Sequence, residues 1–403
     1  MSSDSYRWVI LGLAFLAFGI SYMVRMIYPP LIPMMRVALN LTYSESGMLM
    51  SGFWIGYVMM QLPAGLVSDK IGVRRIYTVS LTVTGITCIL TGFAKSFLDC
   101  LAYRFANGLA AGCICAPGSA TVMRWFQPKD RAIALSIFQL SVSVGTVIAT
   151  ALSVIVASAF GGWMWTFWIF GIPSLAAAIL TLLFLKERPE GASEPDLGKE
   201  SRLDYGAVLK SLRVWLLCLA GLGGGIIFIG TLTWVPTYLV KIVNLTEAHA
   251  GAVSSLMLLL GSFGTPLSGY IADRVIKRRS PMVLIPIFAA GSGCILISIM
   301  KPIEMYQTIL MFAFVLLSST MWWIIPSILS EWLPMNILGT ASGLLSSMMS
   351  LGGVLGPFIF GLVLDLTGSF YHGWFLLGSV AILLASPMAL STSKRFIASM
   401  LKH

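Results

Sequence analysis

The stretch that decides the fold is a basic turn between two apolar runs, and the chain contains it twice. The first copy is Gly65-Leu66-Val67-Ser68-Asp69-Lys70-Ile71-Gly72-Val73-Arg74-Arg75, and the second begins Gly269-Tyr270-Ile271-Ala272-Asp273-Arg274 and ends Lys277-Arg278-Arg279. A shift of 204 residues superposes the two copies, and the same shift carries Asn40-Leu41-Thr42 onto Asn244-Leu245-Thr246 without a gap. The chain is therefore built from an internal duplication.

The composition around these turns excludes a water-soluble protein. Of 403 residues, 57% are hydrophobic and only 10% are charged, against about 25% charged in an ordinary soluble domain. A bilayer span needs about 20 apolar residues, and continuous apolar runs favour helices over the alternating strands of a barrel. We predict an all-α membrane protein with twelve transmembrane helices in two pseudo-symmetric six-helix bundles. The expected spans are residues 8–35, 44–68, 75–95, 99–124, 131–160, 163–186, 209–242, 247–272, 280–301, 304–330, 337–366 and 371–393.

The positions of the cations predict how these helices are oriented in the membrane. Lys and Arg number 26 against 16 acids. With the N-terminus inside, all but six of the cations fall on the cytoplasmic side. The six exceptions are Arg25, Arg36, Lys95, Arg104, Lys241 and Lys301. We therefore predict cytoplasmic termini and a location in the plasma (cytoplasmic) membrane, and the basic excess requires no nucleic acid.

One polar stretch divides the chain into six spans on either side. We predict an N-terminal bundle at 1–186, a cytoplasmic linker at 187–208 and a C-terminal bundle at 209–403. Two similar bundles that rock around a site between them are the expected plan of an alternating-access carrier. The sequence contains no Gly-x-x-x-x-Gly-Lys loop and no metal-ligand spacing of Cys and His, so we expect no ATP-driven pump, metal, cofactor or enzyme.

The repeated turn resembles a signature of the major facilitator superfamily. The first copy is complete, whereas Ile276 replaces the second glycine in the second copy. Arg104-Phe105-Ala106-Asn107-Gly108 resembles the family's Arg-and-glycine pattern in the fourth span. The resemblance covers nearly the whole chain and implies a secondary transporter. It also implies a cytoplasmic latch between the bundles, formed by Asp69, Arg74, Arg75 and Asp273.

Arg25 lies in the middle of the first span, where a charge costs about 2.5–3.5 kcal/mol on insertion scales. Tyr22 and Tyr28 are three residues before and after it, so in a continuous helix all three side chains project to one face. Pro29 and the two prolines that follow are expected to bend the outer end of this helix. An arginine between phenols can bind a carboxylate through two parallel hydrogen bonds. We predict an anion site at Arg25; the alternative is that it pairs only with backbone carbonyls or water.

No acidic residue lies near the middle of a predicted span. A buried cation without a buried acid favours an organic anion, most simply a carboxylate, over a cationic substrate. Tyr22-x-x-Arg25 and the run Trp234 to Leu239 resemble the organic-anion branch of the superfamily, which includes anion:cation symporters and organophosphate exchangers. Two departures matter. Only Lys241 is available as a second cation in span 7, and the stretch Gly108 to Gly112 of span 4 offers no acid for proton coupling. Uniport, exchange and co-transport of a proton or cation all stay open.

The remaining candidates lie on spans 4, 5, 7 and 10. We predict substrate contacts by Trp234, Tyr238, Trp322, Trp323 and Gln139. Packing against lipid or neighbouring helices is the alternative for the aromatic residues. Arg104 and Asp99, five residues apart, are candidates for gating or proton coupling, and a structural pin between helices is the alternative for Arg104. The Gly-rich half of span 7 is where a gating helix can bend.

Two other functions fit the same sequence. One is an exporter of hydrophobic or amphipathic compounds, which would be indifferent to Arg25. The other is an organophosphate exchanger. In each case the expected partners are the lipid bilayer and a small-molecule substrate, with no nucleic acid, and we expect a monomer.

Overall fold

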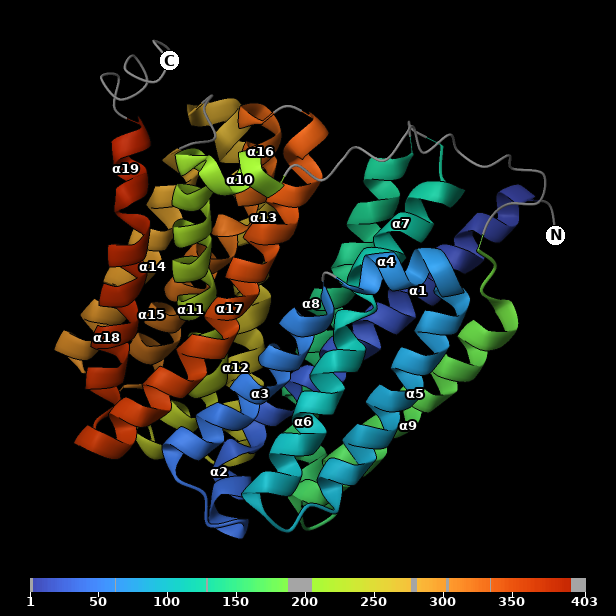
Figure 1. The fold of residues 1–403 in the computed structure, drawn as a ribbon. Helices are drawn as coiled ribbons and strands as arrows, with labels where there is room; N and C mark the ends of the chain where they lie inside the picture. The colour runs from blue at the N-terminus through green and yellow to red at the C-terminus, as the bar shows by residue number, and fades with distance from the viewer. Residues whose placement is uncertain are drawn as a thin grey trace. The chain divides into compact units, whose positions relative to one another are not determined.

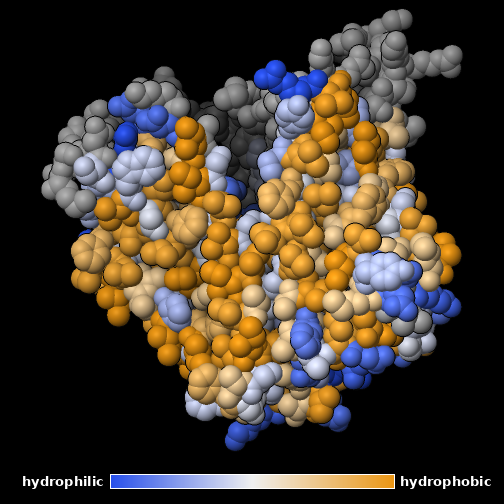
Figure 2. All heavy atoms as spheres, turned by 180° about the vertical axis from the view of Figure 1, so that it is seen from behind, coloured by the Kyte–Doolittle hydropathy of each residue, from blue (hydrophilic) through white to orange (hydrophobic). Residues whose placement is uncertain are grey.

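The computed structural model describes residues 3–61, 63–127, 130–187, 205–276, 281–301, 304–333 and 335–392. Within these residues every regular element is a helix (Figure 1). Nine segments of the described chain are long and apolar enough to cross a membrane. Hydrophobic side chains cover most of the face seen in Figure 2. The predicted fold class, an all-α membrane protein, is confirmed.

The helices divide between the two halves of the sequence. Those of the first half are α1 (Ser3–Met26), α2 (Tyr28–Ala38), α3 (Tyr43–Gln61), α4 (Pro63–Ile71), α5 (Val73–Gly92), α6 (Phe97–Gly112), α7 (Cys115–Trp125), α8 (Arg131–Ala159) and α9 (Trp163–Phe184). Those of the second half are α10 (Tyr205–Lys210), α11 (Leu212–Lys241), α12 (Glu247–Ser262), α13 (Gly264–Tyr270), η1 (Ile271–Ile276), α14 (Pro281–Met300), α15 (Met305–Met321), η2 (Trp322–Ile324), α16 (Ile325–Trp332), α17 (Met335–Thr367), α18 (Phe370–Ala385) and α19 (Pro387–Thr392).

The nine long apolar segments do not include three of the twelve predicted spans, 44–68, 99–124 and 304–330. Two of these spans consist of shorter helices, because 99–124 is interrupted at Cys113–Ile114 and 304–330 by the 3₁₀ turn η2, while 44–68 includes a residue outside the described chain. Interrupted helices are common where a carrier binds its substrate. The count of twelve stays a prediction.

The first span is interrupted where its prolines predict a bend. α1 ends at Met26, and α2 begins at Tyr28 with prolines in its first turn. Proline is tolerated there because the first N–H groups of a helix have no partner within it. Pro29 therefore has no N–H to donate to the carbonyl oxygen of Arg25, four residues earlier. By contrast, α11 runs without interruption through its Gly-rich half.

The described chain divides into two compact units. The first comprises the described parts of Met1–Leu41, Met48–Asp196 and Leu245–Ser255, and the second those of Thr42–Gly47, Leu197–Asn244 and Leu256–His403. Each unit therefore takes a short segment from the other half of the sequence. In unit 2, the Asp365 carboxylate accepts hydrogen bonds from the backbone N–H groups of Tyr43 (2.9 Å) and Ser44 (2.7 Å). In unit 1, the Ser255 hydroxyl donates to Thr150 Oγ1 at 2.8 Å.

Glycine contacts between long helices recur in the two units. In unit 1, α5 and α9 approach so closely that a Cβ on Gly85 would lie 3.0 Å from the carbonyl oxygen of Gly171. In unit 2, α14 and α18 do the same, and a Cβ on Gly291 would lie 2.9 Å from the carbonyl oxygen of Gly378. These pairs are 206 and 207 residues apart in sequence, close to the shift of the signature turns. The duplication therefore extends to the packing of helices.

The two signature turns differ where their sequences differ. Gly72 has a backbone φ angle of +89°, which residues other than glycine rarely adopt. This residue separates the end of α4 from the start of α5. Ile276 holds the corresponding place in the second copy. There the backbone does not turn at that residue but continues as the π-helix η1 (Ile271–Ile276).

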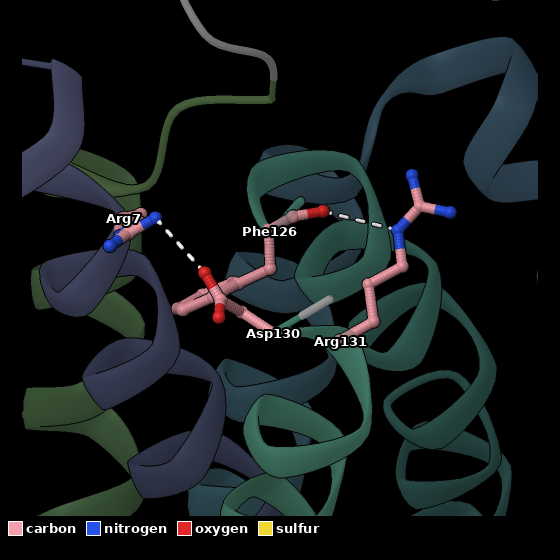
Figure 3. A network of polar contacts seen from close by, with 4 residues as sticks. All are labelled: Arg7, Phe126, Asp130 and Arg131. Carbon is pink, nitrogen blue, oxygen red and sulfur yellow. Dashed lines mark hydrogen bonds and ion pairs between the residues drawn. The ribbon is translucent and has the colours of Figure 1, made fainter. Parts of the chain in front are cut away.

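Polar contacts tie the start of α1 to the connection between α7 and α8 (Figure 3). Arg7 NH1 lies 3.6 Å from Asp130 Oδ2, and Arg131 Nε donates to the carbonyl oxygen of Phe126 at 3.1 Å. The Arg7 guanidinium also lies 5.5 Å from the centre of the Phe126 ring. These contacts hold one end of unit 1 together.

Candidate functional site

Arg25, near the end of α1, is fully buried, with 0% of its surface exposed. Its Nε, NH1 and NH2 atoms have no hydrogen-bond partner among the residues that the structure describes. A buried polar group without a partner costs free energy, and a charged one costs more. Within the described chain, the five N–H donors of Arg25 have no acceptor in hydrogen-bonding geometry, although the phenol groups of Tyr22 and Tyr57 interact electrostatically with the guanidinium.

Four aromatic rings enclose the Arg25 guanidinium within unit 1. Its Cζ atom lies 4.0 Å from the ring centre of Tyr22, 4.6 Å from those of Phe53 and Tyr57, and 4.7 Å from that of Trp54. A cation over an aromatic face gains about 0.5–2 kcal/mol. We call Tyr22, Phe53, Trp54 and Tyr57 the aromatic cage. The cage offers the charge π-faces but no negative group.

Three of the four cage residues are absent from the sequence-based candidates. Phe53, Trp54 and Tyr57 all lie on α3, and their 53/57 spacing places two of them on one face. However, α3 has apolar residues on every side, so its hydrophobic periodicity does not indicate which face lies against Arg25. The aromatic residues at this spacing are the only hint that the sequence holds.

Arg104, on α6, is the second buried cation, with 2% of its surface exposed. Unlike Arg25, each of its nitrogens has an acceptor. Nε donates to the carbonyl oxygen of Leu49 at 3.3 Å, NH2 to Met50 Sδ at 3.2 Å, and NH1 to the carbonyl oxygen of Arg25 at 3.5 Å. The carbonyl oxygen of Arg25 is the one to which Pro29 cannot donate a hydrogen bond. The arrangement fits the structural-pin alternative for Arg104.

Tyr28 borders Arg104, since its ring centre lies 4.8 Å from Arg104 Cζ. The prediction that Tyr28 and Tyr22 flank Arg25 together assumes one continuous helix. The hydrogen-bond pattern is interrupted at Ile27, immediately before α2 begins, although Ile27 keeps helical backbone angles. Tyr22 is confirmed beside Arg25.

Asp99 and Arg104 do not pair with each other in this structure. The Asp99 carboxylate accepts backbone hydrogen bonds from Lys95 and Ser96, both at 3.1 Å, and Ser96 Oγ accepts one from Asp99 N at 3.2 Å. This is a capping box, which satisfies the first N–H groups of α6. Proton coupling through an Asp99–Arg104 pair therefore has no geometric support here.

Arg25 and Arg104 are the two charged side chains that are buried within the described residues. Lys241, the only second cation available on span 7, is exposed at the end of α11. The described interior thus holds positive charge and no acid, as the sequence predicts.

The predicted site residues of α11 pack inside unit 2. Trp234 is fully buried, donates from Nε1 to the carbonyl oxygen of Pro357 at 3.0 Å, and stacks on Phe360 with 5.4 Å between ring centres. Tyr238 is also fully buried and contacts the Phe312 ring at 5.3 Å. These contacts account for the burial of both residues, and a substrate contact stays a prediction for them.

The remaining candidates are less informative. Trp322 is buried in the η2 turn, where its ring would meet any Cβ on Gly224. Gln139 is exposed on α8. The side chains of Trp323, Asp69 and Asp273 lie outside the described residues.

The two latch arginines lie at the start of α5, and both are exposed. Arg74 donates from Nε to the carbonyl oxygen of Leu182 at 2.6 Å. That bond ties the signature turn to the end of α9. The latch itself stays a prediction.

The apolar spans, the duplicated helix packing and the interrupted helices define the class of protein, a membrane carrier built from internal repeats. The chain belongs to the Major Facilitator Superfamily, whose family model matches residues 14–326. The predicted family is confirmed, and it is a family of transporters rather than of enzymes.

Two relatives carry names that denote organic anions. A protein of Cupriavidus necator, named a probable sulfoacetate transporter, is 25% identical over 90% of this chain and 89% of its own length. The hexuronate transporter of Bacillus subtilis is 24% identical over 91% of this chain and 90% of its own length. Among solved structures, a bacterial homologue of the human lysosomal transporter Spinster, inward-facing and unoccupied, has a TM-score of 0.80 at 17% identity, covering 98% of this chain and 97% of that one. This likeness shows the fold.

Proposed function

We propose that the protein is a secondary transporter that moves a small organic anion, most simply a carboxylate, by alternating access. The observation that carries the proposal is Arg25, a fully buried guanidinium without a hydrogen-bond partner or an acid among the described residues. A carboxylate supplies the missing acceptors in the matching two-pronged geometry. The names of the two relatives support the same substrate class.

The aromatic cage supports this role in a second way. Its rings keep the guanidinium away from water, and an ion pair is stronger where water is excluded. They also stabilise the cation while no anion is bound. The anion then adds hydrogen bonds that the cage does not provide.

The wider architecture is part of the proposal. The twelve spans form two bundles at 1–186 and 209–403, joined by a linker at 187–208, with both termini on the cytoplasmic side of the cytoplasmic membrane. Asp69, Arg74, Arg75 and Asp273 form the cytoplasmic latch. The carrier works as a monomer by uniport, exchange or co-transport with a proton or cation.

The test is uptake of radiolabelled sulfoacetate and glucuronate into proteoliposomes, with unlabelled organic acids as competitors. Arg25→Gln keeps polar volume but removes the charge, so uptake at subsaturating substrate should fall by at least about 30-fold, the equivalent of about 2 kcal/mol. Arg25→Lys keeps the charge without the planar fork and should retain part of the activity. A thermal-shift screen of organic acids on the purified protein extends the search to other substrates.

Two outcomes would contradict the proposal. Uptake that is the same in Arg25→Gln and in the unaltered protein would reject Arg25 as the anchor. Transport of apolar dyes that is indifferent to both Arg25 variants, without organic-acid uptake, would favour the exporter.

A further inference from the structure

This inference rests on the proposed function and concerns the charge of the substrate's acidic group. Phe53 is shared by the two buried guanidinium groups. Its ring centre lies 4.6 Å from Arg25 Cζ and 5.2 Å from Arg104 Cζ, and the side chain is fully buried. The ring therefore contacts both cations of unit 1 at once.

The two cations are not equally available to a ligand. Arg104 already donates to two backbone carbonyl oxygens and to the Met50 sulfur, and the Tyr28 ring covers it as well. Arg25 has no hydrogen-bond partner among the described residues. An anion that binds Arg25 thus finds one unpaired positive charge.

We propose that the site accepts an acidic group with a single negative charge, a carboxylate or sulfonate, and that Phe53 enforces this limit by separating Arg104 from the anion. A phosphate monoester carries close to two charges at neutral pH, since its second pKa is about 6. Its second charge would be buried against aromatic rings without a partner, which is costly. The site therefore rejects phosphate esters, and the organophosphate exchanger is excluded on this account.

The first experiment compares acidic groups that carry the same methyl substituent. Acetate, methanesulfonate and methyl phosphate are titrated against the purified full-length protein at about pH 8, where methyl phosphate is a dianion. The ionic strength is matched with sodium chloride, and binding is read from the rise in melting temperature. Acetate and methanesulfonate should bind at least about tenfold more tightly than methyl phosphate, and Arg25→Gln should abolish both shifts.

The second experiment removes the partition between the two cations. Phe53→Ala opens the space between the guanidinium groups, so methyl phosphate should gain at least about tenfold in affinity relative to acetate. Phe53→Leu is the control: it removes the ring from the cage and should weaken the binding of both ligands, but an apolar side chain still lies between the cations, so the ratio of acetate to methyl phosphate affinity should stay unchanged. If Phe53→Ala does not fold, the comparison of acidic groups on the unaltered protein still decides the charge limit.

The outcomes separate this inference from the proposed function. Methyl phosphate binding as tightly as acetate in an Arg25-dependent manner overturns the charge limit but leaves the anion site intact. A Phe53→Ala variant that folds and keeps the original preference overturns the role of Phe53. Absence of any Arg25-dependent shift, both here and in the organic-acid screen, overturns the proposed function itself.

Discussion

Both units bury aromatic side chains in close contact with one another, but around different centres. In unit 1 the rings of the aromatic cage surround the Arg25 guanidinium. In unit 2 the rings pack against one another, with 5.4 Å between the centres of Trp234 and Phe360 and 4.6 Å between those of Phe360 and Trp374. Unit 1 therefore uses part of its aromatic surface to hold a charge, whereas these rings of unit 2 fill a core.

Because the chain is duplicated, the two units can be compared position by position. A shift of 204 residues places Arg25 on Ile229 of α11, which is buried with 5% of its surface exposed. The glycine contacts between long helices recur in both units, whereas the charged side chains that are buried among the described residues lie in unit 1.

The largest expected effect comes from moving the charge into the wrong unit. Ile229→Arg places a guanidinium at a position that is buried and apolar in the unaltered protein, so we expect the protein to lose at least about 3 kcal/mol of stability. Ile229→Met is the matched control of similar length and should melt within a few degrees of the unaltered protein. The measurement is the melting temperature in detergent. If Ile229→Arg is as stable as Ile229→Met, unit 2 tolerates charge as well as unit 1 and the contrast between the units fails.

The next effect tests what the units share. A Cβ on Gly85 would lie 2.7 Å from Leu175 Cδ2, and one on Gly291 would lie 2.7 Å from Ile382 Cγ1. Gly85→Ala and Gly291→Ala should therefore each lower the free energy of unfolding by about 1–3 kcal/mol through overpacking. The two losses should be similar. Gly12→Ala, where a Cβ meets nothing within 4 Å, is the control on an exposed helix face and should not destabilise. A large difference between the first two variants would show that the repeated contact has unequal weight in the two units.

Much of this contrast is visible in the sequence. A single Arg in the middle of an apolar run identifies Arg25 without a structure, because charge at that depth is costly. The capping box is also legible, since Ser96-x-x-Asp99 before an apolar run is its sequence signature. That signature predicts that Asp99 is engaged at the helix start, and side chains five residues apart do not share a helix face. The pairing of Asp99 with Arg104 is therefore the weaker of the two interpretations on sequence alone.

Two features are not visible in the sequence. The cage residues of α3 cannot be selected because α3 is apolar on every side, so periodicity gives it no inward face. The partner of Tyr28 depends on how the chain bends after Ile27. The prolines predict a bend, but they do not give its direction. In both cases the missing information is how two segments meet, and that is decided by packing rather than by local pattern.

A smaller effect separates stability from function within unit 1. Arg25→Met removes a buried charge that has no described hydrogen-bond partner and replaces it with an apolar chain of similar length. Since such replacements are often neutral or stabilising, we expect stability to rise by about 1 kcal/mol while organic-acid uptake is lost. Arg104→Met is the comparison, because it also leaves the carbonyl oxygen of Arg25 without its donor and should destabilise. A fall in melting temperature for Arg25→Met would mean that the contacts of the cage with the cation outweigh the free-energy cost of burying it.

The smallest effect belongs to a charge at the surface, the Arg7–Asp130 pair of Figure 3. The two side chains are 22% and 36% exposed and lie 3.6 Å apart, so water and salt screen their attraction and the pair contributes about 0–1 kcal/mol. Arg7→Gln should lower the melting temperature slightly at low salt and not at all at high salt, where screening removes the interaction. The effect of Arg25→Met on the melting temperature should not depend on salt, because the charge that it removes is buried. A salt-independent loss in Arg7→Gln would instead point to the guanidinium's contact with the Phe126 ring, so that even at its surface unit 1 would hold its cations chiefly through aromatic rings.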